Sequence, residues 1–429
     1  MNPRSTRRQF LKRTGLLTAA AGFAGNIPSL RAAGANNKVR VGVIGCNSRG
    51  MDHIRGYLAV PEAEITYICD VDSRVAEKGV AAVARQQEKK PKAITDLRRM
   101  LEDPELDAVS IATPDHWHTP AAILACAAGK HVYVEKPGSH NLKESEWLVT
   151  AARHHRRIVQ MGNQRRSWPW VIESIELLKQ GGVGTVHFAR GWYTNHRSSI
   201  GHGKVVSPPE ALNWELWQGP APEEPFRDNV VPYNWHWFWN WGTGELGNNG
   251  VHALDLARWG LGVDLPQRAT CGGGRYHYHD DWQTPDTILA TFDFGDKAIS
   301  WEGQSCDPRG FEGASFGVNF YGEGGSLVIA GTNCRVYDLK ETLVKEIKGK
   351  SDDVLHFANF IAAIRNGEAL RSEIEEGQKA SLLCHLGNIA WRSGRTVDFD
   401  SASRKLVGGE SMLPLASRKY RPGWEPRVS

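Results

Sequence analysis

Hydrophobic positions in the first third of the chain follow two alternating patterns. Short runs of β-branched and aromatic residues, typical of strands, are separated by longer stretches in which apolar residues recur every three or four positions, as in helices. This alternation predicts a parallel sheet with crossover helices. We expect strands at 39–44, 64–69, 108–112, 131–135 and 157–161, and helices at 73–87, 120–128 and 143–154.

The pattern changes after residue 163. Long alternating runs, such as "TILATFDFGDKAISWEG" from Thr287, contain Gly-bearing turns that are typical of antiparallel hairpins, and helical periodicity returns at 354–365 and 373–393. The connection 193–234, rich in Gly and Pro, has little regular pattern, and loops of that length are often functional. The predicted fold class is α/β: a doubly wound Rossmann domain at 38–162, an α+β domain with a large open, mainly antiparallel sheet at 163–400, and a tail at 401–429.

The first 35 residues differ from the rest of the chain. Arg7 and Arg8 are followed by Phe-Leu-Lys, a weakly apolar run and the small residues Ala33-Gly-Ala35. This order predicts a twin-arginine signal at 1–35, so we expect a periplasmic or otherwise exported protein that engages the export machinery. A basic arm or a short membrane anchor is the alternative, but the apolar run is shorter than the roughly 20 residues that span a bilayer.

Composition excludes several classes of protein. Hydrophobic residues make up 41% of the chain and charged residues 23%, as in ordinary soluble domains. Residues 1–35 hold six basic and no acidic residues, which leaves 46 basic against 48 acidic beyond them, so nothing indicates nucleic-acid binding. The seven cysteines lack CxxC spacing and are interpreted as buried thiols, and His277 and His279 have no further ligand at helical spacing, so no metal site is expected.

A glycine loop follows the first predicted strand. In Gly45-Cys-Asn-Ser-Arg-Gly50 the first glycine permits a tight turn and the last permits close packing of helix on strand. Asn47 replaces the usual middle glycine, and asparagine tolerates left-handed backbone. The loop therefore predicts a dinucleotide pyrophosphate at the helix N-terminus. The expected cofactor contacts are Gly45, Asn47, Ser48, Arg49 and Gly50.

Asp70 ends the second predicted strand, where a carboxylate accepts hydrogen bonds from the adenosine ribose. A 2'-phosphate would be repelled there, so NAD is favoured over NADP, although Arg74 leaves NADP open. Capping of the following turn is the alternative role for Asp70.

Two further stretches resemble one family. Ala112-Thr-Pro-Asp-His-Trp-His118 and Glu135-Lys-Pro137 are similar to motifs of the Gfo/Idh/MocA family, named for glucose-fructose oxidoreductase, inositol dehydrogenase and MocA. The likeness runs from residue 38 to about 400 and implies an NAD(P) cofactor and a substrate-binding second domain. It implies that Lys136 lies beside both cofactor and substrate and that Pro137 shapes the next turn. The residues implied along the nicotinamide side are Thr113, Pro114, His118, Glu135 and Lys136.

The family's second-domain motif, Asp-x-Gly-x-His, corresponds here to Asn248-Asn-Gly-Val-His252. Asn248, His252 and Asp255 fall on one face of a helix, which we expect Asn248 or Asn249 to cap. The resemblance implies that His252 is the base for a substrate hydroxyl and that Lys136 stabilises the developing alkoxide. A core histidine is the alternative for His252. Asn248 cannot ionise, so we expect it to bind a hydroxyl instead, and Asp255 either orients His252 near the substrate or anchors the helix.

Two more groups are candidate substrate ligands. Arg165, in the run Gln164-Arg-Arg166, reaches either substrate or the surface. Trp235, Trp237, Trp239 and Trp241 share one face if their segment is extended. Rings such as Trp239 then stack on a sugar or, alternatively, pack inside the protein.

Together these features predict an NAD(P)-dependent oxidoreductase that acts on a secondary alcohol of a sugar, sugar derivative or polyol. Because free NAD is scarce outside the cytoplasm, we expect the cofactor to stay tightly bound, and we expect a homo-oligomer formed through the second-domain sheet. The first alternative is an NAD-dependent, redox-assisted glycoside hydrolase. The second is a non-catalytic sugar- or nucleotide-binding protein.

Overall fold

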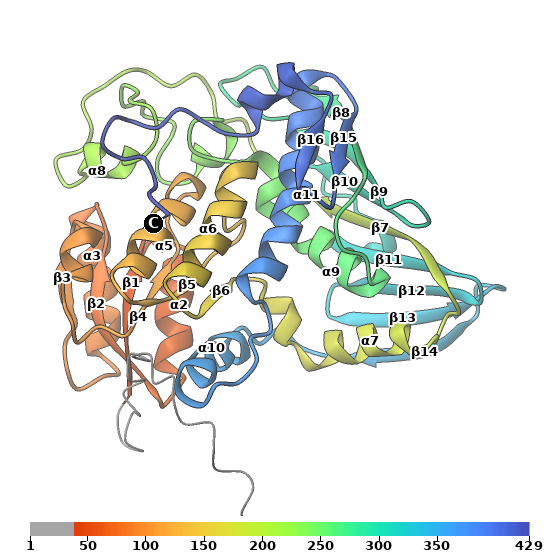
Figure 1. Cartoon of the computed structure of the whole chain (residues 1–429), viewed down its shortest axis with the longest axis horizontal. Coiled ribbons are helices and arrows are strands. Elements are labelled where there is room, and N and C mark those ends of the chain that lie inside the picture. Colours follow the sequence, from red (N-terminus) through yellow and green to blue (C-terminus); the bar gives the residue numbers. More distant parts are fainter. Residues whose placement is uncertain (1–37, 429) are drawn as a thin grey trace, which may run out of the picture. The chain divides into compact units, whose positions relative to one another are not determined.

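The computed structural model describes residues 38–428, and the predicted export signal lies outside these residues. Within them, the first half contains a parallel six-stranded sheet in the order β3-β2-β1-β4-β5-β6 (Figure 1). The prediction of a doubly wound sheet is confirmed. Its strands are β1 (Val39–Ile44), β2 (Ala63–Cys69), β3 (Lys92–Ile94), β4 (Ala108–Ile111), β5 (His131–Val134) and β6 (Val159–Met161).

The helices between these strands begin at side-chain caps where the sequence supplies them. The side chains of Asp72 and Asn141 accept backbone N–H bonds at the starts of α3 and α6. Helix α5 begins at Asp115, directly after Pro114, so it starts five residues earlier than predicted and includes His118. The helices are α2 (Arg49–Leu58), α3 (Ser73–Ala84), α4 (Leu97–Leu101), α5 (Asp115–Ala127) and α6 (Leu142–His154).

The second half is built on a ten-stranded sheet within the described residues, in the order β14-β13-β12-β11-β7-β10-β9-β8-β15-β16. Strand β10 pairs parallel with β7, and the other neighbours pair antiparallel, which confirms the mainly antiparallel sheet. Its strands are β7 (Val186–Thr194), β8 (Arg268–Gly274), β9 (Thr287–Asp293), β10 (Ala298–Gln304), β11 (Phe316–Gly322), β12 (Gly325–Ala330), β13 (Asn333–Asp338), β14 (Leu343–Lys348), β15 (Val397–Asp400) and β16 (Lys405–Val407).

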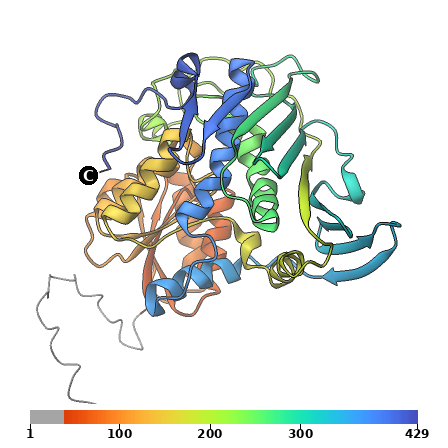
Figure 2. The ribbon, with the colours of Figure 1, turned by 45° about the vertical axis from the view of Figure 1, so that its right-hand side comes forward.

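Helices cover one face of the second sheet. These are α7 (Pro169–Lys179), α9 (Val251–Leu261) and α11 (Ile374–Ser393) (Figures 1 and 2). Side chains of β9 alternate between buried and exposed, and Leu289 is 57% exposed on the uncovered face. Helix α10 (Val354–Asn366), which the sequence assigns to the second domain, instead packs Phe357 and Phe360 into the core of the first sheet beside Tyr133.

The irregular segment 195–241, which we call the roof, lies over the carboxyl ends of the first sheet. It contains α8 (Trp214–Gln218) and the 3-10 turn η2 (Asn234–Trp237), and it has its own apolar cluster. Backbone bonds join it to the turn after β2, from Ser73 N to Ala211 O and from Asn213 N to Val71 O. The predicted long connection is therefore an ordered cover and not an open loop.

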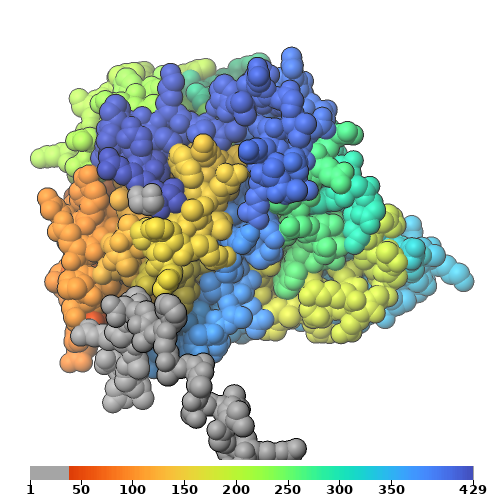
Figure 3. All heavy atoms as spheres, viewed as in Figure 1, coloured from red at the N-terminus to blue at the C-terminus, as the bar shows by residue number. Residues whose placement is uncertain are grey.

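The C-terminal tail returns to the first half. Figure 3 shows it, in dark blue, between α6 and the roof. The Tyr420 hydroxyl donates to Glu144 of α6, and the Arg421 guanidinium donates to Glu215 O of the roof. All seven cysteines are free, and every one except Cys271 is buried, as expected for structural thiols. Among the helices of residues 38–428, none has the length and apolar character needed to cross a bilayer.

Candidate active site

A cavity of about 570 Å³ lies where the first sheet's strands end, beneath the roof. Its floor is formed by the residues that follow β1, β2, β4 and β5, and its cover by roof residues such as Trp217 and Trp235. In doubly wound sheets this edge is where dinucleotides bind. Of the predicted cofactor contacts, it brings together Gly45, Asn47, Ser48, Arg49, Asp70, Thr113, Pro114, His118, Glu135 and Lys136.

The glycine loop leaves room for a dinucleotide. Gly45 has φ of 78°, and a Cβ there would lie 2.8 Å from the backbone of Ala112. A Cβ on Gly50 would collide with Gly45 O, which explains the close approach of α2 to β1. The left-handed backbone expected at Asn47 falls instead on Ser48, whose φ is 41°. Ser48 and Arg49, at the start of α2, line the cavity where a pyrophosphate is expected.

Asp70 is placed where both of its predicted roles are open to it. One carboxylate oxygen accepts from Cys46 N at 2.7 Å and the other from Asp72 N at 2.9 Å, so Asp70 fixes the glycine loop. It also lines the cavity, where each oxygen retains a lone pair for a ribose hydroxyl. The guanidinium of Arg74 is held by Asp72 at 2.6 Å. That pairing leaves Arg74 less available to a 2'-phosphate, so the arrangement favours NAD.

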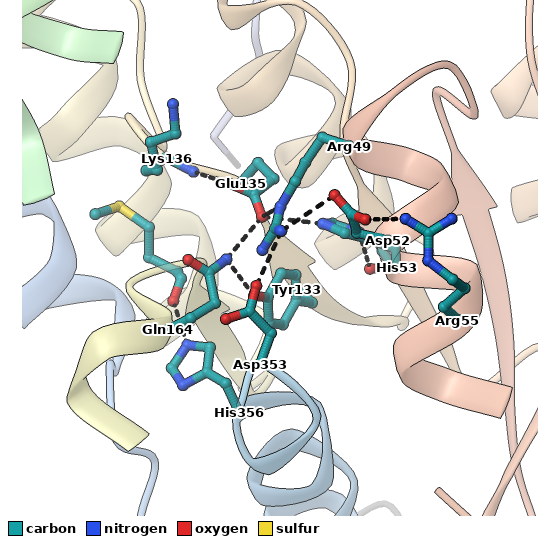
Figure 4. Close-up of polar contacts among 12 residues, drawn as sticks. Arg49, Asp52, His53, Arg55, Tyr133, Glu135, Lys136, Gln164, Asp353 and His356 are labelled. Atoms are coloured by element: carbon teal, nitrogen blue, oxygen red, sulfur yellow. Dashed lines mark hydrogen bonds and ion pairs between the residues drawn. The ribbon is translucent and has the colours of Figure 1, made fainter. Parts of the chain in front are cut away.

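Glu135 is the centre of a buried polar cluster below the cavity (Figure 4). One of its oxygens is contacted by Arg49 at 2.8 Å, His53 at 3.0 Å and Gln164 at 2.9 Å. Burial opposes its ionisation, but the charge of Arg49 and the bond from His53 lower the pKa of Glu135 well below its usual range. Arg49 also pairs with Asp353 at 3.0 Å. The cluster thus joins α2, β5 and α10 and keeps a fixed negative charge next to Lys136.

Lys136 is the cation that faces the substrate end of the cavity. Its amine donates to Asn248 O at 2.7 Å and to Asn248 Oδ1 at 3.1 Å, and Figure 4 shows it pointing away from the Glu135 cluster. Burial lowers its pKa, against the opposing charges of Glu135, Asp115 and Glu245. An ammonium has three donors, so one N–H remains for a ligand oxygen. The peptide bond to Pro137 is cis.

Glu245 supplies a carboxylate that sequence reasoning missed. It is 2% exposed and pairs with Arg197 at 2.9 Å, and it accepts from Ser305 at 3.0 Å. The amide N–H of Asn248 donates to it at 3.4 Å, which orients the amide oxygen toward Lys136. A chain of hydrogen bonds therefore connects the Glu245 carboxylate, through the Asn248 amide, to the Lys136 amine. The available signal was an acidic residue three positions before Asn248 in an otherwise neutral stretch.

The helix expected around Asn248 has a different form. Residues Leu246–Gly250 form a π-helical turn, η3, which continues into α9 at Val251. Neither Asn248 nor Asn249 caps α9; both donate to Glu245. The side chains of Asn248 and His252 therefore do not share one helix face, contrary to the prediction.

His252 and Asp255 occupy separate environments. His252 is half-buried on α9, does not belong to the cavity wall, and has no hydrogen-bond partner among residues 38–428. Burial and the charges of Lys136 and Arg165 lower its pKa well below 6.5, so the imidazole is neutral. Asp255 is 2% exposed and binds Arg166 through both oxygens at 2.8 Å. It anchors α9, as one of its two predicted roles requires, and it neither contacts His252 nor lines the cofactor cavity.

Arg165 does not line the cofactor cavity. The guanidinium of Arg165 lies 3.9 Å from the Phe316 ring centre, without an ion pair among the described residues, and outside the cavity wall.

The four alternating tryptophans do not share a face, because the turn η2 rotates them apart. Trp235 lines the cavity, whereas Trp237 and Trp241 are 1% and 3% exposed core residues. Trp239, the predicted sugar ligand, lines a different cavity.

His236 and Asp115 complete the cavity wall near Lys136, and sequence reasoning missed both. His236 Nδ1 bonds Tyr233 O at 2.6 Å, which places its proton on Nδ1 and leaves Nε2 as an acceptor. Burial lowers the pKa of His236 to about 3. Asp115 accepts from Thr243 at 2.6 Å, and burial raises its pKa to about 6. The Thr243 contact spans 128 positions of sequence, so no local pattern reveals it.

The two-domain fold and the cavity define a dinucleotide-dependent oxidoreductase. The cavity fits such a cofactor, since the glycine loop leaves the required space and Thr113 Oγ1 is buried without a partner among residues 38–428. Two family models match: the NAD-binding Rossmann fold of the Gfo/Idh/MocA oxidoreductase family over residues 39–163, and its C-terminal alpha/beta domain over residues 184–426. The chain belongs to the Gfo/Idh/MocA oxidoreductase family, and its cofactor is NAD.

Individual relatives are similar over part of the chain. An alpha-N-acetylgalactosaminidase of Shewanella oneidensis is 32% identical over 37% of this chain and 39% of its own length. A levoglucosan dehydrogenase of Pseudarthrobacter phenanthrenivorans is 27% identical over 52% and 51%. The chain thus spans between about a third and a half of these curated relatives. The fold is similar to that of the WlbA dehydrogenase from Bordetella pertussis in complex with NADH and UDP-GlcNAcA, with a TM-score of 0.65, 19% identity, and coverage of 85% and 99%.

Proposed function

We propose that this protein oxidises or reduces a secondary alcohol carbon of a sugar, sugar derivative or polyol. A bound NAD would exchange the hydride with that carbon. The observation that carries the proposal is the free N–H of Lys136, which is held by Asn248 inside the cofactor cavity. The relative named levoglucosan dehydrogenase, with 27% identity, supports a carbohydrate substrate.

Each polar residue of the site has a separate role in this reaction. Lys136 binds the substrate oxygen and stabilises the negative charge that develops on it. The role of base is assigned to neutral His252 on the family resemblance, because the charge of Lys136 acts on its ring although the ring lies outside the cavity wall. His236 Nε2 accepts a hydrogen bond from a neighbouring hydroxyl. Roof residues such as Trp235 exclude water from the cavity and give an apolar face for the sugar ring. Asn248 positions Lys136 and does not transfer a proton.

The pH profile of kcat/KM follows from these protonation states. His252 must be neutral to accept a proton, and its pKa lies below 6.5, so activity is lost only as the pH falls through that lower value. Lys136 must be charged, and its pKa lies below 10.5, so activity is lost as the pH rises through it. We expect a plateau through neutral pH with an acidic limb below 6.5. An acidic limb above pH 6.5 that disappears in His252→Asn would contradict the lowered pKa of the His252 imidazole.

The roof and the tail favour slow release of the cofactor. Trp424 packs edge-on against Trp117, a cavity residue, at 5.5 Å, and lies between Arg98 and Arg421, each 4.7 Å from its ring centre. Arg421 in turn holds the roof through Glu215 O at 3.2 Å. The cofactor is therefore enclosed by contacts that must open before it leaves.

Trp424→Ala should weaken retention of NAD by about tenfold, because it removes one aromatic and two cation–π contacts worth about 0.5 to 1.5 kcal/mol each. The measurement is the dissociation rate of NAD from the purified enzyme, followed by competition with a fluorescent analogue. Trp391→Ala, which truncates a half-buried tryptophan outside the cofactor cavity, is the matched control and should leave the rate unchanged. Equal rates in Trp424→Ala and wild type would refute the enclosure.

A redox-assisted glycoside hydrolase is the second candidate, because six relatives are named as glycosyl hydrolases and a seventh as an alpha-N-acetylgalactosaminidase. In that reaction the same oxidation makes the glycosidic group eliminable. A screen of sugars, polyols and aryl glycosides, with NADH and aglycone followed together, separates the two. NADH formation without aglycone release supports the dehydrogenase, and aglycone release without net NADH supports the hydrolase. Neither product, with Lys136 intact and NAD bound, counts against both and supports a binding protein.

We also propose that the protein is exported and that it forms a homo-oligomer. The paired arginines Arg7 and Arg8 suggest export through the twin-arginine route, which cell fractionation tests. Exposed Leu289 on the uncovered face of the second sheet supports a homo-oligomer formed through that face, which light scattering tests.

A further inference from the structure

A second cavity, of about 200 Å³, is separate from the cofactor cavity. The segment 235–243 borders both: Trp235 and His236 line the cofactor cavity, and Trp239 and Thr243 line the second. The remaining wall comes from the turn after β5, from Pro222 of the roof, from the last turns of α11 and from the C-terminal tail. No residue belongs to both walls, so the second cavity is a distinct space.

The wall of the second cavity is positively charged, and the Glu144 carboxylate that acts on Arg418 lies outside this wall. It contains Arg392 and Arg418 and no aspartate or glutamate. Arg418 donates to Asn240 O at 2.9 Å, and Arg392 lies 4.8 Å from the ring centre of Trp239. Neither guanidinium forms an ion pair with another of residues 38–428. Guanidinium groups stay charged, and in a partly buried cavity without carboxylates they favour an anionic ligand.

The same wall contains buried N–H donors without acceptors. Arg418 lies 3.2 Å from His140 Nδ1, and arginine can only donate, so Nδ1 is the acceptor and the His140 proton resides on Nε2. His140 Nε2 and Arg418 Nε are both buried and have no partner within the described part of the chain. Unpaired buried donors are unfavourable, and a ligand with several acceptor oxygens would satisfy them.

We propose that this cavity is a binding site for a small oxyanion, that is, a carboxylate, sulfate or phosphate group, held by Arg392, Arg418 and His140. The exposed side chain of Arg392 marks the side from which solvent and ligand enter. The Trp239 ring beside it forms a flat apolar wall for a carbon skeleton attached to the anionic group. The site thus suits either a free inorganic anion or a sugar that carries an acidic group.

Isothermal titration of the NAD-loaded full-length enzyme tests the proposal, with sulfate, phosphate, glucuronate and, as the uncharged comparison, glucose. Loading with NAD blocks the pyrophosphate site. We expect wild type to bind at least one of the anions and to bind glucose no more than one-tenth as tightly. Tighter binding of glucuronate than of sulfate or phosphate identifies a sugar acid, and the reverse order identifies an inorganic anion.

The variants assign any binding to the second cavity. Arg392→Gln and His140→Phe should each weaken the anion by at least tenfold. Arg395→Gln, which removes an exposed arginine just beyond α11 and outside the cavity, should bind as wild type does, and so should Lys136→Met in the cofactor cavity. Circular dichroism confirms that each variant is folded. Absence of anion binding by wild type, or equal binding by wild type and Arg392→Gln, would overturn the proposal.

Discussion

Replacing Lys136 with methionine should lower the kcat of the NAD-loaded enzyme by about a thousandfold, the effect of removing a preorganised group that stabilises charge in the transition state. Lys136 already donates to Asn248 O and Oδ1, so its third N–H is fixed in the cavity before substrate arrives. Methionine keeps most of the volume of the side chain but supplies no donor. The affinity for NAD should change little, because the glycine loop and Asp70 remain. Steady-state kinetics and a titration with NAD measure the two effects.

Lys78→Met is the matched control for this prediction. Lys78 lines the same cavity from α3, one turn beyond Arg74. Its loss should leave the kcat of the cofactor-loaded enzyme within about twofold of wild type, as for most surface substitutions. If Lys136→Met retains more than a tenth of the wild-type kcat, Lys136 does not stabilise the developing charge.

Glu245→Gln should destabilise the protein by about 3 kcal/mol and also lower kcat, because it leaves the charge of buried Arg197 unpaired. Glu245 also orients the Asn248 amide, whose oxygen holds Lys136. Without this negative charge the ammonium of Lys136 is less favoured, so its pKa falls and the basic limb of the kcat profile moves to lower pH. Urea unfolding and the pH dependence of kcat measure the two consequences.

A double variant separates stability from positioning. Glu245→Gln combined with Arg197→Met removes both charges, and replacement of a buried pair by an apolar group is often neutral for stability. We expect the double variant to recover most of the lost free energy of unfolding while kcat and the basic limb remain shifted. Recovery of wild-type kcat together with stability would show that Glu245 acts only through the fold.

The first half of the fold could be predicted because its signals are local. The strand, glycine loop and helix around Gly45 are continuous in sequence, and Asp70 ends the next strand. The ten-stranded sheet was predictable as a class from alternation, but its strand order depends on pairings between distant segments. The packing of Phe357 against Tyr133 is likewise a long-range contact, which periodicity on α10 cannot identify.

The residues of the candidate site that belong to a sequence motif were predicted. Those that only the folded chain brings together were missed. Lys136 and Asn248 are in contact although 112 positions separate them, and the family resemblance anticipated both. The π-turn at Leu246–Gly250 and the turn η2 change the direction of side chains within a few residues, so faces deduced from regular periods fail for Asp255 and Trp239. Glu245 and His236 are functional candidates because of buried partners that only the folded chain brings together.

The asparagine at the position of the family's aspartate no longer implies a lost function. A carboxylate is present three residues earlier, at Glu245, and it reaches Lys136 through the Asn248 amide. Lys136 therefore keeps an acidic partner, and the π-helical turn Leu246–Gly250 places Asn248 between Lys136 and Glu245. This arrangement accounts for a neutral amide beside a charged lysine in one buried site.

Single-turnover reduction of the bound cofactor tests the central claim most directly. The NAD-loaded enzyme is mixed with an excess of each sugar or polyol, deuterated at successive carbons, and the nicotinamide absorbance is followed through one turnover. The account predicts that at least one substrate reduces the cofactor, that deuterium at a single secondary carbon slows the change and appears in the cofactor, and that Lys136→Met abolishes it. Reduction that is unaffected by Lys136→Met would contradict the account, as would the absence of reduction with every substrate.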